Sequence, residues 1–282
     1  MPMRSLLFVP GDRPDRMGKA LGSGADALIL DLEDAVAPGA KAEARRHVAQ
    51  FVDAHGSANL WVRVNPLDSH EIERDLAAVL PAHPHGIVLP KAEGGVSVNE
   101  LARRLTESGN ATAQILAIAT ETPAAMFQLG TYGGAKRLAG LTWGAEDLPA
   151  AIGAVTSREE DGRYTPPYEL ARSLCLFGAA AAGVAPIETV YPAFQDLDGL
   201  AAYAARARRD GFSGMMAIHP AQVAVINQAF TPSEAEVAHA RAVVAAFEAN
   251  PEAGALSLEG KMIDRPHLVQ ARRVLMADPE SG

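Results

Sequence analysis

The feature that most constrains the fold of this chain is a series of short apolar runs, each followed by a segment with helical spacing. Most of the runs are continuous rather than alternating, which is typical of parallel strands covered on both faces. Ala40–His55 and Leu197–Arg209 are the clearest helical segments between them, with charged residues separating the apolar positions. The runs lie at Ser5–Val9, Ala27–Leu30, Leu60–Val64, Gly86–Leu89, Gln114–Ala119, Leu138–Trp143, Pro186–Val190 and Met215–Ile218.

Eight strand–helix units in 282 residues predict an α/β fold, namely a closed (β/α)₈ TIM barrel with a C-terminal helical extension. A doubly wound open sheet is the alternative, but no Gly-x-Gly-x-x-Gly motif follows the first run. We therefore expect a barrel over residues 1–228 and a helical arm or lid over residues 229–282.

The tail beyond the eighth run has helical signals of its own. Ala221–Phe230 and Ser233–Ala249 are predicted helices. A loop is expected over Asn250–Lys261, followed by a last helix that begins near Pro266 with Asp264 as its N-cap. This tail is expected to be either a lid or an arm that packs on a neighbouring subunit.

Composition excludes several classes of protein. A formal charge of −9 argues against a nucleic acid or an anionic membrane as the main partner. The one cysteine, Cys175, lies in an apolar run, which excludes a disulfide framework and a cysteine-rich metal site and predicts a core position. The N-terminal apolar run is too short for a signal peptide, and no stretch is long enough to span a bilayer. We expect a soluble, cytoplasmic protein.

Two acidic side chains follow successive apolar runs, at the ends of strands where barrel proteins place their chemistry. Glu121 follows the fifth run, and Asp147 follows the sixth. Desolvated like charges repel, so such a pair is normally matched by a base or by a cation. Because oxygen ligands suit Mg²⁺ or Mn²⁺, we predict a divalent metal site at this end of the barrel.

Other polar residues at strand ends have more than one interpretation. Asp31, Glu33 and Asp34 either surround the metal ligands or cap local structure. Lys91 is either the Schiff-base nucleophile of an aldolase or an ion-pair partner of the acidic cluster, and we favour the ion pair. His219 is interpreted as structural rather than as a general base.

Six motifs along the chain resemble those of the citrate lyase β-subunit and malyl-CoA lyase family of Mg²⁺-dependent C–C lyases. The resemblance implies a lyase that cleaves or forms a C–C bond in a 3-hydroxyacyl-CoA, such as a malyl-, citramalyl- or citryl-like thioester, giving acetyl-CoA and a keto-acid. We expect a homo-oligomer, either a trimer or a hexamer. The motifs lie at Phe8–Pro14, Asp31–Val36, Arg63–Asn65, Leu89–Lys91, Glu121–Pro123 and Gly144–Asp147, and the similarity continues to Gly260–Asp264.

Residue by residue, the resemblance implies that Glu121 and Asp147 ligate Mg²⁺, with the keto-acid bound at the open positions beside Glu121. It implies that Arg63 contacts the reacting carbonyl or the keto-acid, where a fixed guanidinium stabilises a developing enolate oxygen. It also implies that Asp264 acts as the general acid–base and reaches the neighbouring subunit's site. Without the resemblance, Asp264 is equally consistent with a plain N-cap.

For the coenzyme, the resemblance implies that Phe8, Arg13 and Lys19 hold the CoA nucleotide. Arg13 and Lys19 stand six residues apart across the start of a helix, a spacing that lets them reach separate phosphates. Lys19 and Arg16 are equally consistent with ordinary solvated helix charges.

Three other functions remain open at this point. One is the β-subunit of a multi-subunit citrate lyase, which acts on a citryl thioester of a carrier protein. Another is a non-catalytic CoA-binding barrel. The last is a lysine-dependent aldolase built on Lys91, which would not need the two carboxylates.

Overall fold

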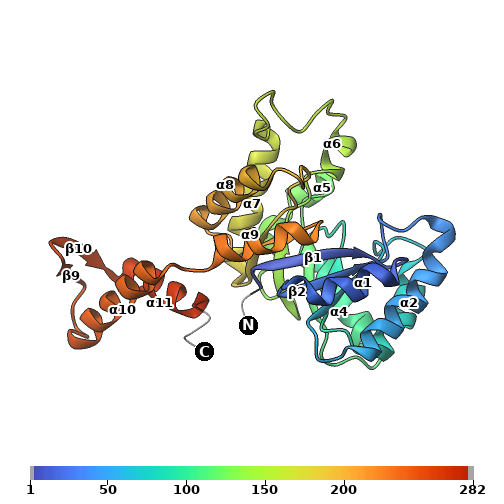
Figure 1. The fold of residues 1–282 in the computed structure, drawn as a ribbon, viewed down its shortest axis with the longest axis horizontal. Helices are drawn as coiled ribbons and strands as arrows, with labels where there is room; N and C mark the ends of the chain where they lie inside the picture. Colours follow the sequence, from blue (N-terminus) through green and yellow to red (C-terminus); the bar gives the residue numbers. More distant parts are fainter. Residues whose placement is uncertain (1–2, 279–282) are drawn as a thin grey trace. The chain divides into compact units, whose positions relative to one another are not determined.

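The computed structural model describes residues 3–278. The chain forms two compact units, one over Met3–Asn227 and a second that begins at Gln228 (Figure 1). Within the described residues, no helix combines the length and the apolar character needed to cross a bilayer.

The first unit is a closed barrel of parallel strands. Each strand pairs with its neighbours in chain order, and β1 closes the barrel on β8, so the predicted (β/α)₈ barrel is confirmed and the open sheet is wrong. The strands are β1 Ser5–Pro10, β2 Ala27–Asp31, β3 Leu60–Arg63, β4 Gly86–Leu89, β5 Gln114–Ile118, β6 Leu138–Thr142, β7 Ala185–Glu188 and β8 Gly214–Ala217.

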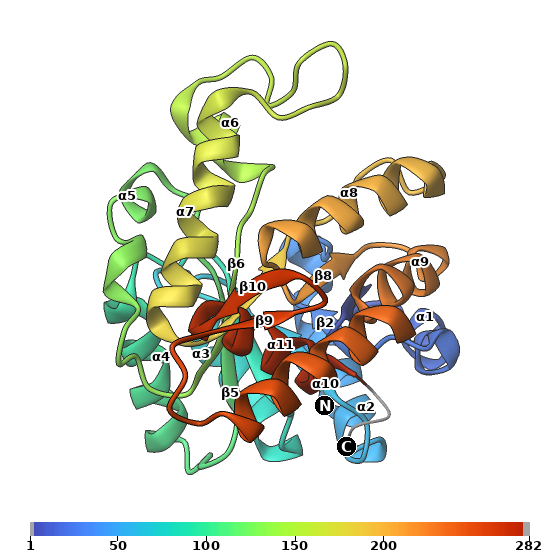
Figure 2. The same ribbon diagram turned by 90° about the vertical axis from the view of Figure 1, so that its left-hand side faces the viewer.

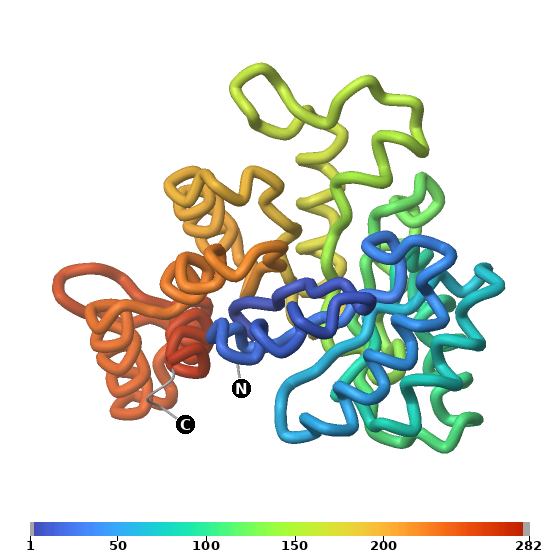
Figure 3. Tube along the Cα trace, turned by 45° about the vertical axis from the view of Figure 1, so that its right-hand side comes forward, coloured from blue at the N-terminus to red at the C-terminus, as the bar shows by residue number. Residues whose placement is uncertain are grey.

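Helices follow the strands around the outside of the barrel, as the change of colour along the tube in Figure 3 shows. After β6, the short helix α6 leads into a loop, and the long helix α7 then packs against β6 and β7. The helices are α1 Pro14–Ala20, α2 Lys41–Ala54, α3 Ile72–Val79, α4 Gly95–Glu107, α5 Pro123–Met126, α6 Asp147–Ile152, α7 Pro166–Ala182, α8 Leu197–Asp210 and α9 Pro220–Phe230.

The barrel interior is a packed apolar core. Leu6, Ile29, Trp61 and Leu116 are buried in it, each contributed by a different strand. A Cβ at Gly86 would collide with the Trp61 indole ring, so the large residue on β3 requires a small one on the adjacent β4. Because this interior is filled, an open cavity can form only at the ends of the strands.

The second unit contains two helices and a hairpin, which Figure 2 shows together. The helices are α10 Glu234–Ala249 and α11 Arg265–Ala277, which pack side by side, and Asp264 is the N-cap of α11 as predicted. A separate apolar core, including Phe247, Ile263 and Leu268, holds the unit together.

The loop predicted over Asn250–Lys261 is wrong in part, because strands β9 Ala255–Leu258 and β10 Lys261–Asp264 form a hairpin there. The two residues between the strands, Glu259 and Gly260, have φ angles of 52° and 77°. A two-residue turn with both φ angles positive matches the twist of a hairpin.

Candidate active site

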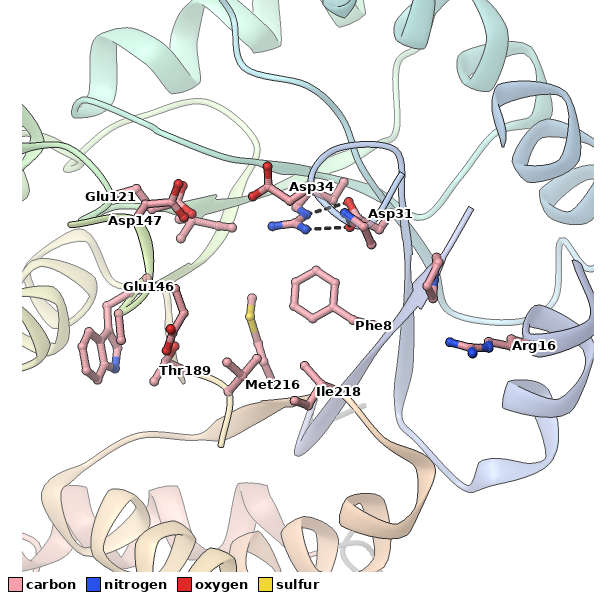
Figure 4. Close-up of a pocket in the computed structure, with 18 residues that line it drawn as sticks. Phe8, Arg16, Asp31, Asp34, Glu121, Glu146, Asp147, Thr189, Met216 and Ile218 are labelled. Atoms are coloured by element: carbon pink, nitrogen blue, oxygen red, sulfur yellow. Dashed lines mark hydrogen bonds and ion pairs between the residues drawn. The ribbon is translucent and has the colours of Figure 1, made fainter. Parts of the chain in front are cut away.

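A cavity of about 360 Å³ opens at the carboxyl ends of the barrel strands (Figure 4). Its walls combine apolar side chains with both acidic and basic groups. Residues that line it include Phe8, Arg16, Asp31, Arg63, Ile118, Glu121, Trp143, Glu146, Asp147, Thr189 and Met216.

Glu121 follows β5 and is buried at the cavity wall, with 4% of its surface exposed. Its Oε2 accepts a hydrogen bond from the Lys91 main-chain N–H at 2.5 Å. Burial raises the pKa of Glu121 to about 8, and the nearby Glu33 and Asp147 charges add to the rise. A Cβ at Gly144 would lie 2.6 Å from Glu121 Cγ, so the glycine makes the space that this carboxylate occupies.

Asp147 is the first residue of α6, directly after the end of β6. Its side chain is partly exposed, and Oδ1 lies 3.3 Å from the Lys91 ammonium. Figure 4 shows the carboxyl groups of Glu121 and Asp147 at one edge of the cavity, as the sequence predicted.

Arg63, at the end of β3, is held rigidly by two acids. Its guanidinium donates to both oxygens of Asp31, at 2.7 and 2.6 Å, and Nη1 lies 3.0 Å from Glu33 Oε2. The same guanidinium lies over the Phe8 ring, 4.9 Å from its centroid. A planar cation fixed by a bidentate carboxylate is well suited to bind an oxygen that gains charge.

Lys91 completes the ionic network, and its interpretation as an ion-pair partner is confirmed. Its ammonium lies 2.7 Å from Glu33 Oε1 and 3.3 Å from Asp147. Burial would lower the pKa of Lys91, but Glu33 and the charges of Glu121 and Asp147 hold the pKa above its ordinary value. A lysine that stays protonated is a poor Schiff-base nucleophile, which argues against the lysine-dependent aldolase.

Asp31 caps local structure and holds Arg63, whereas the Glu33 carboxylate pairs with Arg63 and Lys91. Asp34 lines the cavity. Asp31 accepts hydrogen bonds from the main-chain N–H groups of Glu33 and Ala35, at 2.9 and 3.0 Å, and it also holds Arg63. Burial raises the pKa of Glu33, while Arg63 and Lys91 oppose the rise.

The donor atoms at this edge fit a hard divalent cation. Glu121 and Asp147 present carboxylate oxygens to an open cavity, and Glu121 packs against a glycine that leaves it room. Within residues 3–278, no three His, Cys, Asp or Glu side chains are grouped to hold a metal. Two carboxylates would supply part of an oxygen shell and leave positions for water and substrate, which is the common arrangement for Mg²⁺.

The predicted nucleotide-binding residues differ in position. Phe8 lines the cavity, whereas Arg13 and Lys19 do not. Arg13 is exposed and pairs with Asp15 at 3.1 Å, and Lys19 is exposed in the last turn of α1. Arg16 is exposed on the same helix, as a solvated charge would be, and it also lines the cavity.

Asp264 lies in the second unit, where the N-cap interpretation is confirmed. Its carboxylate accepts from the His267 main-chain N–H at 3.5 Å and contacts His267 Nδ1 at 2.5 Å. The hydrogen bond from His267 lowers the pKa of Asp264. An ionised carboxylate on a helix cap is able to accept a proton, and 36% of its side-chain surface is exposed.

One buried network behind the cavity was not assigned from the sequence. Glu188, at the end of β7, accepts from the Trp143 indole N–H and from the Tyr203 hydroxyl, the latter at 2.9 Å. Arg172 on α7 donates to its other oxygen at 2.7 Å. Glu188 is the last residue of β7, the position where barrel proteins place polar groups, whereas nothing in the sequence marked Arg172.

Two other assignments agree with the structure. Cys175 is fully buried on α7, and burial raises the pKa of its thiol. His219 is exposed, stacks on Phe194 with ring centroids 5.1 Å apart and accepts from the Ala221 N–H, so its contacts are structural.

The fold and the cavity define a TIM-barrel protein with paired carboxylates and a fixed arginine at its mouth. Residues 4–220 match the HpcH/HpaI aldolase/citrate lyase family, and the chain belongs to that family.

Relatives share this chain over nearly its full length. A citrate lyase subunit beta-like protein of Mycobacterium tuberculosis is 37% identical over 95% of this chain and 93% of its own length. A (3S)-malyl-CoA thioesterase of Cereibacter sphaeroides is 34% identical over 97% of this chain and 94% of its own.

Solved structures agree with this assignment. The crystal structure of CitE from Mycobacterium tuberculosis in complex with magnesium, acetoacetate and coenzyme A has a TM-score of 0.82 and 34% identity, covering 98% of both chains. A citrate lyase beta subunit from the same organism, complexed with oxaloacetate and magnesium, has a TM-score of 0.73 and 33% identity, covering 82% of this chain and 98% of its own.

Proposed function

We propose that this protein is a Mg²⁺-dependent lyase that cleaves or forms a C–C bond in a 3-hydroxyacyl-CoA. The observation that carries the proposal is the position of Arg63, locked by Asp31 and Glu33 in the same cavity as the Glu121–Asp147 pair. The reaction needs a group that binds the keto-acid and another that stabilises an enolate, and the cavity holds candidates for both.

Glu121 and Asp147 would hold the cation, and the keto-acid would bind beside them. Mg²⁺ supplies Lewis acidity to a bound carbonyl. Complexes of related proteins with magnesium and either acetoacetate or oxaloacetate support this arrangement.

Arg63 would stabilise the oxygen of the thioester enolate. In the cleavage direction the hydroxyl proton leaves, the C–C electron pair moves into the thioester carbonyl, and the resulting enolate takes a proton at carbon to give the acetyl thioester. Negative charge collects on the thioester oxygen, and Arg63 is already oriented to meet it, so little reorganisation is needed.

Asp264 would carry the proton to or from the acetyl carbon. It belongs to a small unit that folds around its own core, outside the closed barrel. In a homo-oligomer, such a unit can serve the neighbouring barrel as well as its own. We infer that it acts across a subunit boundary, in a trimer or a hexamer.

Phe8 and Arg16 would contact the coenzyme at the cavity, and Arg13 and Lys19 would bind its phosphates farther along α1. Phe8 and Arg16 line the cavity, whereas Arg13 and Lys19 lie on the exposed start and end of the same helix. The related complex that contains coenzyme A supports binding of this ligand.

Thioester hydrolysis is a second candidate, favoured by one residue and one relative. Glu146 lines the cavity, and within the described chain its carboxylate has no hydrogen bond or ion pair. A free carboxylate can act as general base for water. The Cereibacter sphaeroides relative is named a malyl-CoA thioesterase.

Product analysis separates these functions. The protein is incubated with malyl-CoA and Mg²⁺, and the products are identified by mass spectrometry. The lyase gives glyoxylate and acetyl-CoA, whereas the thioesterase gives malate and free CoA. Turnover only of a carrier-protein thioester would identify a citrate lyase β-subunit. If no product forms from malyl-, citramalyl- or citryl-thioesters, the remaining interpretation is a non-catalytic CoA-binding barrel.

A further inference from the structure

Lys91 contacts both of the proposed metal ligands, by different atoms. Its main-chain N–H donates to Glu121 Oε2 at 2.5 Å, and its ammonium lies 3.3 Å from Asp147 Oδ1. Glu121 follows β5 and Asp147 follows β6, so one residue after β4 connects the ends of two other strands.

The backbone of Lys91 is in an uncommon conformation. Its φ angle is 50°, in the left-handed region that favours glycine or asparagine. A long side chain at such a position costs conformational energy that glycine would avoid, and favourable contacts of the side chain offset such a cost. The Lys91 ammonium makes these contacts with Glu33 and Asp147.

The cations Arg63 and Lys91 at the barrel mouth share Glu33 but otherwise pair with different acids. Arg63 is occupied by Asp31 and Glu33, at 2.6 and 3.0 Å. In the chain described here, Lys91 is the cation that contacts Asp147, and it reaches Glu33 more closely than Asp147. The ammonium therefore lies next to an oxygen that the divalent cation would also need.

We propose that Lys91 is a positioning residue that competes with the divalent cation for Asp147. Before the cation binds, the ammonium offsets repulsion between the carboxylates and holds Asp147 at the cavity edge. When the cation binds, Asp147 exchanges the ammonium for the metal, and Lys91 keeps its closer contact with Glu33. Lys91 thus weakens metal binding while it keeps the empty site assembled. The inference rests on the proposed metal site at Glu121 and Asp147.

The first test is the affinity for Mg²⁺, measured by isothermal titration calorimetry on the full chain without substrate. Lys91→Met removes the competing charge and is expected to bind Mg²⁺ at least about tenfold more tightly. Lys91→Arg retains the charge and should bind close to the wild-type affinity. Lys136→Met is the matched control, because Lys136 is exposed and precedes β6 at the opposite end of the strand.

Structural damage to the site would weaken Mg²⁺ binding. Tighter binding by the variant therefore cannot be explained by damage. Lys91→Gln repeats the test with a polar side chain in case the methionine variant does not fold. Unchanged or weaker binding in the folded, uncharged variants would overturn the inference while leaving the proposed function intact. A wild-type protein that takes up no Mg²⁺ would overturn both.

A crystal structure with Mg²⁺ bound tests the exchange directly. The expected result is that Lys91 stays within ion-pair distance of Glu33 and lies beyond 4 Å from Asp147, the usual limit of an ion pair. An ammonium that remains on Asp147 while Asp147 ligates the metal would contradict the exchange.

Discussion

Glu121 at the barrel mouth and Asp264 in the second unit are held in opposite ways. Glu121 is buried, and burial raises its pKa to about 8. Asp264 is partly exposed, and its pKa is lowered by His267 three residues along the same chain segment. Glu121 depends on a network drawn from several strands, whereas Asp264 depends on the first turn of one helix.

This difference suits the proposed division between ligand binding at the barrel mouth and proton transfer by Asp264. Ligand binding uses groups that are costly to desolvate, so each carboxylate needs partners built into the barrel. Proton transfer needs an accessible group, and a capping aspartate on a separate unit provides one at little structural cost. Substitutions at the mouth should therefore change both metal binding and stability, whereas substitution of Asp264 should change turnover.

The largest expected effect is the loss of a metal ligand. Glu121→Ala or Asp147→Ala should abolish measurable Mg²⁺ binding and lower turnover at least about a thousandfold. Calorimetry and product formation check both effects, and circular dichroism serves as the folding control. If the enzyme is insensitive to chelators, or if a variant keeps its metal and its activity, then Glu121 and Asp147 do not hold a metal that the reaction needs.

Loss of the fixed arginine should have the next largest effect. Arg63→Ala is expected to lower kcat by about a hundredfold to a thousandfold, because the enolate loses its stabilising donor. It also leaves Asp31 without its cation and Glu33 with Lys91 alone, so the melting temperature should fall. Arg63→Lys separates the two effects, since lysine restores the charge but not the bidentate geometry. A lysine variant with wild-type kcat would show that the bidentate geometry of the Arg63 guanidinium is not needed for turnover.

The raised pKa of Glu121 predicts that Mg²⁺ binding depends on pH. The metal requires the ionised carboxylate, so protons compete with it below the pKa of about 8. Affinity for Mg²⁺ should fall by up to about tenfold for each pH unit below 8 and level off above it. Titration calorimetry across this range checks the dependence. A flat profile would show that Glu121 is already ionised in the metal-free protein.

The smallest expected effects concern the coenzyme. Arg16→Ala should raise KM for the acyl-CoA about tenfold, because one charge-assisted contact with the coenzyme is lost. The kcat should change little. Arg13→Ala and Lys19→Ala should raise KM less, because neither side chain lines the cavity. Steady-state kinetics with all three variants would rank them. Equal losses of kcat at constant KM would place these residues in the chemistry rather than in binding.

The barrel was predictable because each strand is a largely apolar run with a polar residue at its end or two positions beyond it. That pattern also located Glu121, Asp147 and Arg63, since residues after parallel strands meet at one end of a barrel. The pairing of Lys91 with Glu33 and Asp147 was anticipated only as a general ion pair. Its details depend on a left-handed backbone that the sequence does not mark with glycine.

Other features were hidden for identifiable reasons. Whether Arg13, Arg16 or Lys19 faces the cavity depends on the phase of α1, a helix too short to show a clear apolar face. The β9–β10 hairpin was missed because its strands are short and half-exposed, although Gly260 marks its turn. Arg172 lies in a largely apolar helix, and only the fold brings it to Glu188.

Mixing two inactive variants tests the division of labour most directly. Asp264→Asn keeps the helix cap, since asparagine caps as well as aspartate, but it cannot carry the proton. Glu121→Ala keeps Asp264 but lacks the metal ligand. After subunit exchange at equal amounts, we expect roughly a quarter of the wild-type activity, because an intact barrel then meets an intact neighbouring Asp264 in that share of sites. If exchange is confirmed by mass spectrometry and no activity returns, Asp264 does not complete the site of a neighbouring barrel.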